Sequence, residues 1–306
     1  MRIQRGLPQR AGEPVALTIG NFDGVHLGHQ AMLVRLIEAA EDLRLRPAVL
    51  TFDPHPREFF AKDAAPPRLS KLRQKFDLFR AFGVATTIVA RFDKTLADMT
   101  PEAFIDDVLV RRLDARWVLV GDDFRFGKAR AGNLAVLRAH AQTFSVEGMR
   151  TVAVDTQRAS SSAVREALAA GDLRRAAALL GRPYVISGRV AHGDKLGRNL
   201  GFPTANIPLR HRPALSGIFA VRVHGLGAAP RAGVASIGVR PTIRKDGAPL
   251  LEVFLLDFDQ SIYGRRVTVE ILHKLRDEEK YETLDALTHQ IRVDVGRARD
   301  YFARMA

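Results

Sequence analysis

The spacing of hydrophobic and polar positions changes near residue 182. Up to that point, short apolar runs bounded by turn residues alternate with stretches whose apolar residues recur at helical spacing. The runs with the length and composition of buried parallel strands are Val15–Gly20, Ala48–Phe52, Thr86–Ala90, Trp117–Gly121 and Thr151–Asp155. This alternation predicts an α/β domain over residues 1–182, with a parallel sheet that carries helices on both faces.

The helices of this first half carry their own boundary signals. Apolar spacing predicts helices over Ala31–Glu41 and Pro101–Leu113, and the second has Thr100 as its N-cap and a proline at its first position. A further helix over Ala163–Ala170 is followed by a glycine, and Gly181 ends a short helix just before the spacing changes. These signals predict that the two halves are joined near residue 182 by a short connection, without a low-complexity linker.

The second half, residues 183–306, has closely spaced strands with little helix between them. The expected strands are Tyr184–Val190, Ile218–His224, Ala232–Ile237, Leu250–Asp257 and Val267–Leu272. They predict an antiparallel sandwich or small barrel. A long amphipathic helix with Thr283 as its N-cap then ends the chain. We expect its apolar stripe to pack across the β-domain, and that stripe consists of Leu284, Leu287, Ile291, Val295, Ala298 and Phe302.

The composition excludes several classes of protein. Of the 306 residues, 46% are hydrophobic and 26% charged, close to the soluble globular average, so global disorder is excluded. No run of about 18 apolar residues exists, and the first residues lack the apolar segment of a secretory signal. Cysteine is absent, which excludes disulfides and thiolate sites and favours a cytoplasmic location.

The net charge of +13 is the one unusual global property. A strong positive field attracts polyanions, so an RNA-binding protein on an α/β scaffold is one reading. The charge is not concentrated in a tail or block, however, and no aromatic–basic RNA-binding pattern is present. We interpret it as solvated arginines and expect no nucleic-acid or membrane partner, and a monomer or weak homo-oligomer.

The segment GNFDGVHLGH, residues 20–29, is the strongest local signal in the first half. It follows the first expected strand and opens a helix, the position where α/β sheets bind ligands and where a helix N-terminus favours phosphate. His26 and His29 can both reach one phosphate and donate hydrogen bonds to the charge that develops when an α-phosphate is attacked. The candidate nucleotide-binding residues are Gly20, Asn21, Phe22, Asp23, Gly24 and Gly28.

Three later segments supply further candidates, each with an ordinary structural alternative. TFDPHP contains Pro54 and His55, but taken alone it is a proline turn. VGDDFRFG offers aromatic and arginine side chains for flat rings and phosphates, although it could be a packed strand–loop corner. SSSAVR precedes a helix, and its serines would suit an N-cap in any protein. The candidates from the last two segments are Asp123, Phe124, Arg125, Ser161, Ser162 and Arg165.

Together these segments resemble the nucleotidyltransferase superfamily, whose HxGH signature accompanies transfer of AMP or CMP and release of pyrophosphate. FDGVHLGH in place of FDPxHxGH is similar to the FAD synthetase branch, and the later segments resemble its TFxPHP, VGxDFRFG and SSTxIR elements. Ser162 stands where relatives usually have threonine. The resemblance implies a Rossmann-like domain, with His26, His29 and Arg165 in catalysis, serines on ATP phosphates, and Pro54, His55 and the DFR residues on the substrate.

The segment GRVAHGDKLGRNLGFPTAN, residues 188–206, is the densest motif of the second half. Its glycines and basic side chains form a loop suited to nucleotide phosphates, although it is not a Walker A sequence. The candidate nucleotide-binding residues here are Gly193, Lys195, Gly197 and Arg198. Thr204 and Asn206 offer hard oxygen ligands to a hydrated Mg²⁺.

This motif resembles riboflavin kinase, and the likeness continues through GVASIGVRPT, LEVFLLDF, YG and LRDE. We expect a small six-stranded antiparallel barrel, with Glu252 as the base near the ribityl hydroxyl and Arg276 on the substrate. Without such a role, a glutamate in this apolar strand would either be buried at a cost in stability or face outward on an alternating strand.

Over residues 15–300 the chain is therefore similar to the prokaryotic bifunctional riboflavin kinase/FAD synthetases. That family implies conversion of riboflavin and ATP to FMN in the second half and of FMN and ATP to FAD and pyrophosphate in the first, with Mg²⁺. A nucleotidyltransferase for pantetheine phosphate or nicotinate mononucleotide is the enzymatic alternative, and the kinase-like half argues against it.

Overall fold

The computed structural model describes residues 1–61, 64–140, 142–193, 197, 200–239 and 249–305. They form two compact units: Met1–Pro66 with Leu72–Ser160, and Pro67–Lys71 with Ser161–Ala306. The second unit therefore takes in the helices that precede residue 182. The functional boundary at residue 182 stays a prediction.

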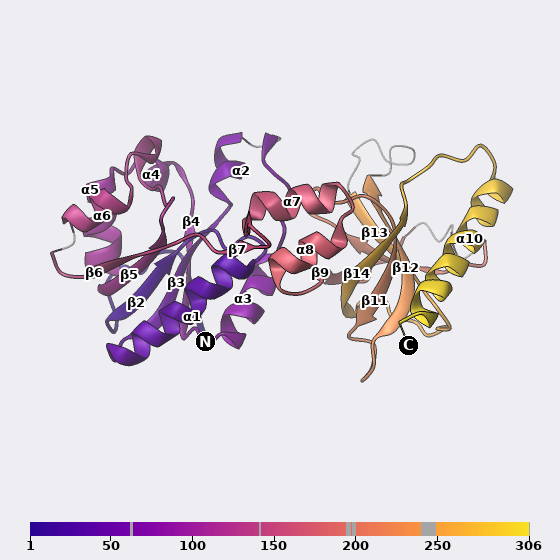
Figure 1. The fold of residues 1–306 in the computed structure, drawn as a ribbon, viewed down its shortest axis with the longest axis horizontal. Helices are drawn as coiled ribbons and strands as arrows, with labels where there is room; N and C mark the ends of the chain where they lie inside the picture. Colours follow the sequence, from indigo (N-terminus) through magenta and orange to yellow (C-terminus); the bar gives the residue numbers. More distant parts are fainter. Residues whose placement is uncertain (62–63, 141, 194–196, 198–199, 240–248, 306) are drawn as a thin grey trace. The chain divides into compact units, whose positions relative to one another are not determined.

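The first unit is built on a parallel sheet of six strands in the order β1-β4-β3-β2-β5-β6 (Figure 1). The strands are β1 Arg2–Arg5, β2 Val15–Ile19, β3 Arg46–Asp53, β4 Thr86–Arg91, β5 Ala115–Gly121 and β6 Ser145–Met149. A separate short hairpin joins β7 Ala153–Val154 to β8 Gln157–Arg158. The predicted parallel α/β architecture is confirmed.

Helices cover both faces of this sheet. They are α1 Leu27–Asp42, α2 Pro56–Ala61, α3 Leu72–Ala81, α4 Lys94–Ala97, α5 Pro101–Ala103, the π-helix η2 Phe104–Arg112, the 3₁₀ turn η3 Lys128–Arg130 and α6 Leu134–His140. Alternate residues of β2 enter different cores: Leu17 packs with the η2 side, whereas Ala16 packs with α1 and α3. This explains why the strands are apolar throughout rather than alternating.

The sequence misplaced one strand of this unit and missed another. Thr151–Asp155 was expected to join the sheet, but the strand beside β5 is Ser145–Met149, and only two residues of the expected run form the β7 strand. β6 is an edge strand with mixed, partly exposed side chains, so its sequence lacks a clear apolar run. β1 is likewise polar and pairs only with β4.

Helix boundary signals were more dependable. The Thr100 hydroxyl accepts a hydrogen bond from the Ala103 N–H at 3.2 Å, as an N-cap does. The helix expected over Pro101–Leu113 forms, but after one α-turn it continues as the π-helix η2.

The second unit holds an antiparallel sheet of six strands in the order β10-β13-β12-β11-β14-β9. The strands are β9 Tyr184–Arg189, β10 Thr204–Pro208, β11 Gly217–His224, β12 Arg231–Val239, β13 Pro249–Leu255 and β14 Arg266–Arg276. A bridge between Ala191 and Asn206 joins the two ends of the sheet, with the Ala191 N–H 2.8 Å from the Asn206 carbonyl oxygen. The expected barrel is confirmed, and β10 is a strand that the sequence had not indicated.

Helices α7 Ser161–Ala169, α8 Leu173–Leu180 and α10 Leu284–Ala303 complete this unit (Figure 1). Gly181 ends α8 in the left-handed conformation, with φ of 68°, as predicted. The Thr283 hydroxyl caps α10 by accepting from the Ala286 N–H at 3.2 Å. The expected apolar stripe was partly wrong, because Leu284 is 57% exposed while Asp294, on the packed face, is only 2% exposed.

The packing of α8 predicts where the kinase half can be separated. α8 contacts β9 and β14 and buries Leu179 and Leu180. A fragment of residues 161–306 should therefore be more stable than one of residues 183–306, with a melting temperature at least about 5 °C higher, because about 1 kcal/mol shifts a small domain by roughly 4–8 °C. Thermal unfolding followed by circular dichroism measures this, and equal melting temperatures would contradict it.

Candidate active sites

The GNFDGVHLGH loop lies where the strand order of the parallel sheet reverses. β2 has β3 on one side and β5 on the other, so the loop after β2 opens into the crevice that such sheets use for ligands. Phe22 and Val25 adopt φ of 50° and 44°, a backbone conformation that residues with side chains rarely accept. Such strain in a loop that enters a helix favours a functional role.

The two histidines of this loop lie together. His26 is the N-cap residue of α1, and its ring stacks on that of His29 with 3.7 Å between centroids. His29 also contacts the Phe22 ring at 4.9 Å. Among the described residues, the buried His29 Nδ1 and Asn21 Oδ1 have no hydrogen-bond partner. Buried polar atoms are normally satisfied, so these two atoms favour a ligand at this loop.

Burial lowers the pKa of His29 well below its ordinary value, and the nearby His26 and Lys75 lower it further. His29 is therefore neutral at physiological pH and offers one N–H donor. The single N–H of the neutral imidazole can donate a hydrogen bond to a phosphate oxygen.

The buried neutral His29 predicts a pH-dependent stability of the first unit. Its folded-state pKa lies below its unfolded value near 6.5, so the unfolded chain binds more protons below that pH, and stability falls as pH decreases. The stability of the first unit should therefore decrease between pH 7.5 and 5.5. Urea unfolding followed by the fluorescence of Trp117, the single tryptophan, measures it in the first unit. His29→Gln should remove this component, and an equal pH dependence in both proteins would contradict the prediction.

Lys75 supports the histidine loop and was missed by the sequence analysis. It lies on α3, is 5% exposed, and donates a hydrogen bond from Nζ to the Asn21 carbonyl oxygen at 2.7 Å. The Thr51 hydroxyl donates to the same oxygen at 3.3 Å. A lysine within the apolar stripe of α3, beside Phe76 and Phe79, was the signal that could have revealed it.

The other candidates of the first unit follow β3 and β5, at the same edge of the sheet as the histidine loop. Pro54 is exposed, and His55 Nδ1 accepts from the Arg57 N–H at 3.0 Å at the start of α2. Asp123 forms an ion pair with Arg158 at 2.5 Å.

Two more candidates lie in the same loop after β5. Phe124 stacks on Phe126 at 5.4 Å, while Arg125 is exposed. The packed-corner alternative therefore accounts for the phenylalanines but not for Arg125.

Ser161, Ser162 and Arg165 lie on α7, in the second unit. Arg165 is half-buried, and its Nε donates to the Pro67 carbonyl oxygen at 2.7 Å. Ser162 is exposed. Their roles stay predictions.

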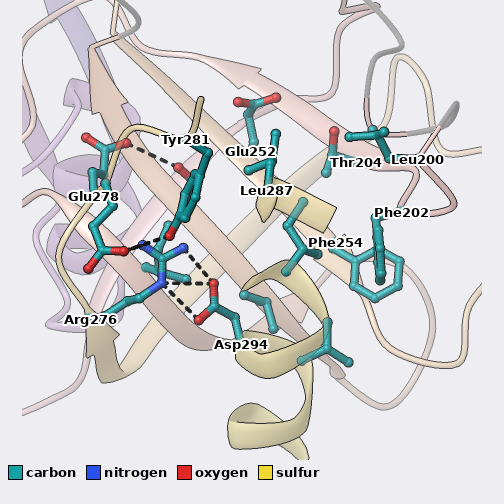
Figure 2. A pocket seen from close by; sticks show the side chains of 17 residues that line it. Leu200, Phe202, Thr204, Glu252, Phe254, Arg276, Glu278, Tyr281, Leu287 and Asp294 are labelled. Atoms are coloured by element: carbon teal, nitrogen blue, oxygen red, sulfur yellow. Dashed lines mark hydrogen bonds and ion pairs between the residues drawn. The ribbon is translucent and has the colours of Figure 1, made fainter. Parts of the chain in front are cut away.

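A cavity of about 240 Å³ lies between the sheet of the second unit and α10, and we call it the α10 cavity (Figure 2). Glu252 lines it from the middle of β13, where it pairs with Asn206 on one side and Ser236 on the other. Glu278 also lines it, and its carboxylate accepts from the Ser236 hydroxyl at 3.3 Å. Burial raises the pKa of the Glu278 carboxyl, and the nearby Glu252 raises it further. Glu252 is partly exposed on the face of β13 opposite the buried Leu251 and Val253, as the alternating-strand alternative expects, and this outer face is the one that lines the α10 cavity.

A second cavity of about 350 Å³, which we call the Tyr263 cavity, lies on the opposite face of β13. Val253 and Leu255 line the Tyr263 cavity, whereas Glu252 and Phe254 line the α10 cavity, as alternation along a strand requires. The Tyr263 ring stacks on His192 with 3.9 Å between centroids.

Thr204 lines both cavities and lies against the glycine motif. A Cβ on Gly197 would lie 2.5 Å from the Phe202 carbonyl oxygen and 3.4 Å from the Thr204 hydroxyl, and one on Gly193 would lie 2.5 Å from the Asn206 amide nitrogen. Only glycine permits this close approach. The Asn206 amide nitrogen donates to the Thr204 carbonyl oxygen at 3.2 Å. Lys195 and Arg198 lie outside the described residues.

The oxygens of Thr204 and Asn206 fit Mg²⁺ chemically. Mg²⁺ prefers oxygen ligands and retains waters and substrate phosphates, so it needs few protein ligands. Within the described parts of the chain, no group of three or more His, Cys, Asp or Glu residues could hold a metal ion.

Arg276 lines the α10 cavity, but much of its guanidinium is already bound. Nε lies 2.9 and 3.0 Å from the two carboxylate oxygens of Asp294, and Nη2 lies 2.7 Å from one of them. Burial acts against the charge of Arg276, but Asp294, together with Tyr281 and Glu279, raises the pKa of the guanidinium above its ordinary value. Asp294 and Tyr281, which also line the cavity, were absent from the sequence-based candidates.

Comparison with known proteins matches the two halves to different families. A family model described as FAD synthetase matches residues 9–163, and one described as riboflavin kinase matches residues 180–302. Relatives named bifunctional riboflavin kinase/FMN adenylyltransferase include that of Haemophilus influenzae, 48% identical over 99% of both chains. That of Escherichia coli K12 is 44% identical over 99% of this chain and 98% of the relative.

The fold is also shared by the crystal structure of a Streptococcus pneumoniae protein described as a macrolide-efflux protein. The TM-score is 0.82 and the identity 27%, over 98% of this chain and 99% of that chain. In this chain, no helix of the described residues is long and apolar enough to cross a membrane.

Proposed function

The chain belongs to the family of bifunctional riboflavin kinase/FMN adenylyltransferases, and from this premise we propose which residues carry each of its two reactions. It phosphorylates riboflavin with ATP to FMN, and it adenylylates FMN with a second ATP to FAD and pyrophosphate. The alternative substrates pantetheine phosphate and nicotinate mononucleotide, and the RNA-binding alternative, leave the riboflavin kinase half unexplained.

The kinase assignment rests on one observation: two cavities lie on opposite faces of β13 and share Thr204. We assign riboflavin to the α10 cavity, which holds Glu252 and apolar walls from α10. ATP is assigned to the Tyr263 cavity, beside the glycine motif. Phosphoryl transfer then takes place at Thr204, where the two substrates meet.

In this arrangement Glu252 accepts the proton of the terminal ribityl hydroxyl. The hydroxyl oxygen bonds to the γ-phosphorus, the bond from that phosphorus to the bridging oxygen breaks, and ADP leaves. Thr204 and the amide oxygen of Asn206 would hold Mg²⁺ with the nucleotide phosphates. When bound, that ion neutralises charge on the transferred phosphoryl group. Gly193 and Gly197 let the loop backbone approach these two residues.

In adenylyl transfer, a phosphate oxygen of FMN attacks the α-phosphorus of ATP and pyrophosphate leaves. His26 and His29 are assigned to the oxygens of that α-phosphate, with the N-terminus of α1 as a further donor site. Lys75 is assigned to holding the loop through the Asn21 carbonyl oxygen. The family motifs predict further roles in substrate and nucleotide binding and in catalysis, and these roles stay predictions. The residues concerned are Pro54, His55, Asp123, Phe124, Arg125, Ser161, Ser162 and Arg165.

Incubation with riboflavin, ATP and Mg²⁺, with the flavins resolved over time, tests the function. We expect FMN first and FAD later. Folded protein that forms no phosphorylated flavin would refute the proposal. Sedimentation equilibrium at several concentrations tests the expected monomer or weak homo-oligomer, and cell fractionation tests the expected cytoplasmic location.

A further inference from the structure

Asp294 is a buried carboxylate in the wall of the α10 cavity. Its side chain is 3% exposed, and its carboxylate is bound to Arg276 (Figure 2). It also accepts a hydrogen bond from Gln290 Nε2 at 3.0 Å. Burying a charge is costly unless it is paired and hydrogen-bonded. The bidentate contact with Arg276 therefore makes this carboxylate tolerable on the packed face of α10.

Arg276 connects three parts of the second unit. It is the last residue of β14, and its Nη1 donates to the Asp277 carbonyl oxygen at 2.8 Å in the segment that leads to α10. In that segment, the Glu279 carboxylate lies 4.0 Å from Nη1, and the Tyr281 ring centroid lies 5.8 Å from the guanidinium carbon. Asp294 then ties the group to α10. One guanidinium thus orients the strand end, the connecting segment and the helix.

Stability alone does not account for an ion pair at this position. Leu287, Ile291 and Val295 line the same cavity from the face of α10 that carries Asp294. An apolar residue at position 294 would continue that face. Replacing a buried ion pair with apolar residues is often neutral or stabilising, so the pair offers geometry rather than net stability. Two parallel hydrogen bonds define both the rotation and the axial position of a helix far better than apolar contact does.

We infer that the Arg276–Asp294 pair is a positioning device that sets the α10 wall of the cavity and thereby determines affinity for the flavin. This inference rests on the assignment of riboflavin to that cavity. The pair acts through Leu287, Ile291 and Val295 and takes no part in the chemistry at Glu252 and Thr204. Weakening it should therefore raise the KM for riboflavin and leave kcat and the KM for ATP nearly unchanged.

The main variants are Asp294→Asn and the double variant Arg276→Met with Asp294→Leu. Asp294→Asn removes the charge but keeps the volume, and we expect a riboflavin KM about tenfold higher, or about 1.4 kcal/mol of lost binding. The apolar double variant should retain the melting temperature, because the packing is preserved without buried charges. Its riboflavin KM should nevertheless be about tenfold higher than that of the unmodified protein. A pair that served stability alone would not produce this rise in KM.

A second ion pair on the same helix supplies the matched control. Arg299 on α10 binds Asp257 with both terminal nitrogens, at 2.6 and 3.0 Å, outside both cavities. Asp257 has φ of 52°, a conformation that asparagine tolerates well. Asp257→Asn should therefore leave the riboflavin KM unchanged. A rise equal to that of Asp294→Asn would show that any loosening of α10 has this effect and would overturn the inference.

Val234→Phe separates this inference from the cavity assignment beneath it. Val234 lines the cavity from β12, so a larger side chain blocks the space wherever α10 lies. A raised riboflavin KM in Val234→Phe together with an unchanged one in the apolar double variant would overturn the positioning role alone. An unchanged KM in Val234→Phe would overturn the cavity assignment and the inference with it. A KM rise in both, with kcat retained in the double variant, supports the inference.

Discussion

Glu252→Gln should lower FMN formation by roughly 10²–10⁴-fold, the usual contribution of general-base catalysis. The amide keeps the volume and most of the hydrogen-bonding capacity of the side chain between Asn206 and Ser236. It cannot accept the proton that leaves the ribityl hydroxyl. A glutamate that served packing alone would tolerate this change within about 1 kcal/mol.

The measurement compares two products in one preparation of the variant. FMN formation from riboflavin should fall, whereas FMN supplied directly should still become FAD, because that reaction is assigned to the other half. Glu270→Gln is the matched control: Glu270 lies on β14 of the same sheet, 3.1 Å from His224, and lines neither cavity. Unchanged FMN formation in Glu252→Gln would remove Glu252 from the mechanism.

His29→Ala should lower FAD formation at least tenfold, and by about 10²–10³-fold if it removes one donor to the transition-state phosphate. FMN formation from riboflavin should stay nearly intact. The imidazole packs against Phe22 and His26, so alanine also leaves a gap in the loop. His29→Leu, which fills more of that space but offers no N–H donor, should show a similar loss of FAD formation if the role is chemical.

His140→Ala provides the control in the same unit. His140 is exposed on α6, and its Nδ1 lies 3.1 Å from the Val136 carbonyl oxygen of its own helix. It should leave FAD formation unchanged. Equal losses of FMN and FAD formation in His29→Leu would instead show that His29 supports the fold.

Sequence reasoning succeeded where the deciding atoms lie within a few residues of one another. The N-caps Thr100 and Thr283 bond to N–H groups three residues ahead, and Gly181 ends α8 through its own backbone conformation. The same holds for the strand–loop–helix that carries His26 and His29. These signals depend on local backbone geometry, so they do not change with the packing of distant parts of the chain.

The strands that were missed or misplaced lack such a local signal. β6 and β1 are edge strands, whose side chains are partly exposed and therefore not uniformly apolar. β10 lies in a segment whose glycines and proline suggest a loop, and it becomes a strand because β13 supplies its hydrogen bonds. Leu284 fell on the predicted apolar stripe, yet it lies at the exposed end of α10.

The spacing of apolar and polar side chains along the sequence determined the two-part architecture, and the resemblance of its motifs to known families indicated the two reactions. Only the tertiary structure decided which side chains share a partner. Arg276 and Asp294 are 18 residues apart, and Lys75 reaches Asn21 across 54 residues. Likewise, each face of β13 lines one of the two cavities. Thr204 lines both cavities because it lies on β10, which pairs with β13. Such contacts depend on how helices and strands pack against one another. The spacing of apolar residues within one helix or strand does not indicate which distant residue it will contact.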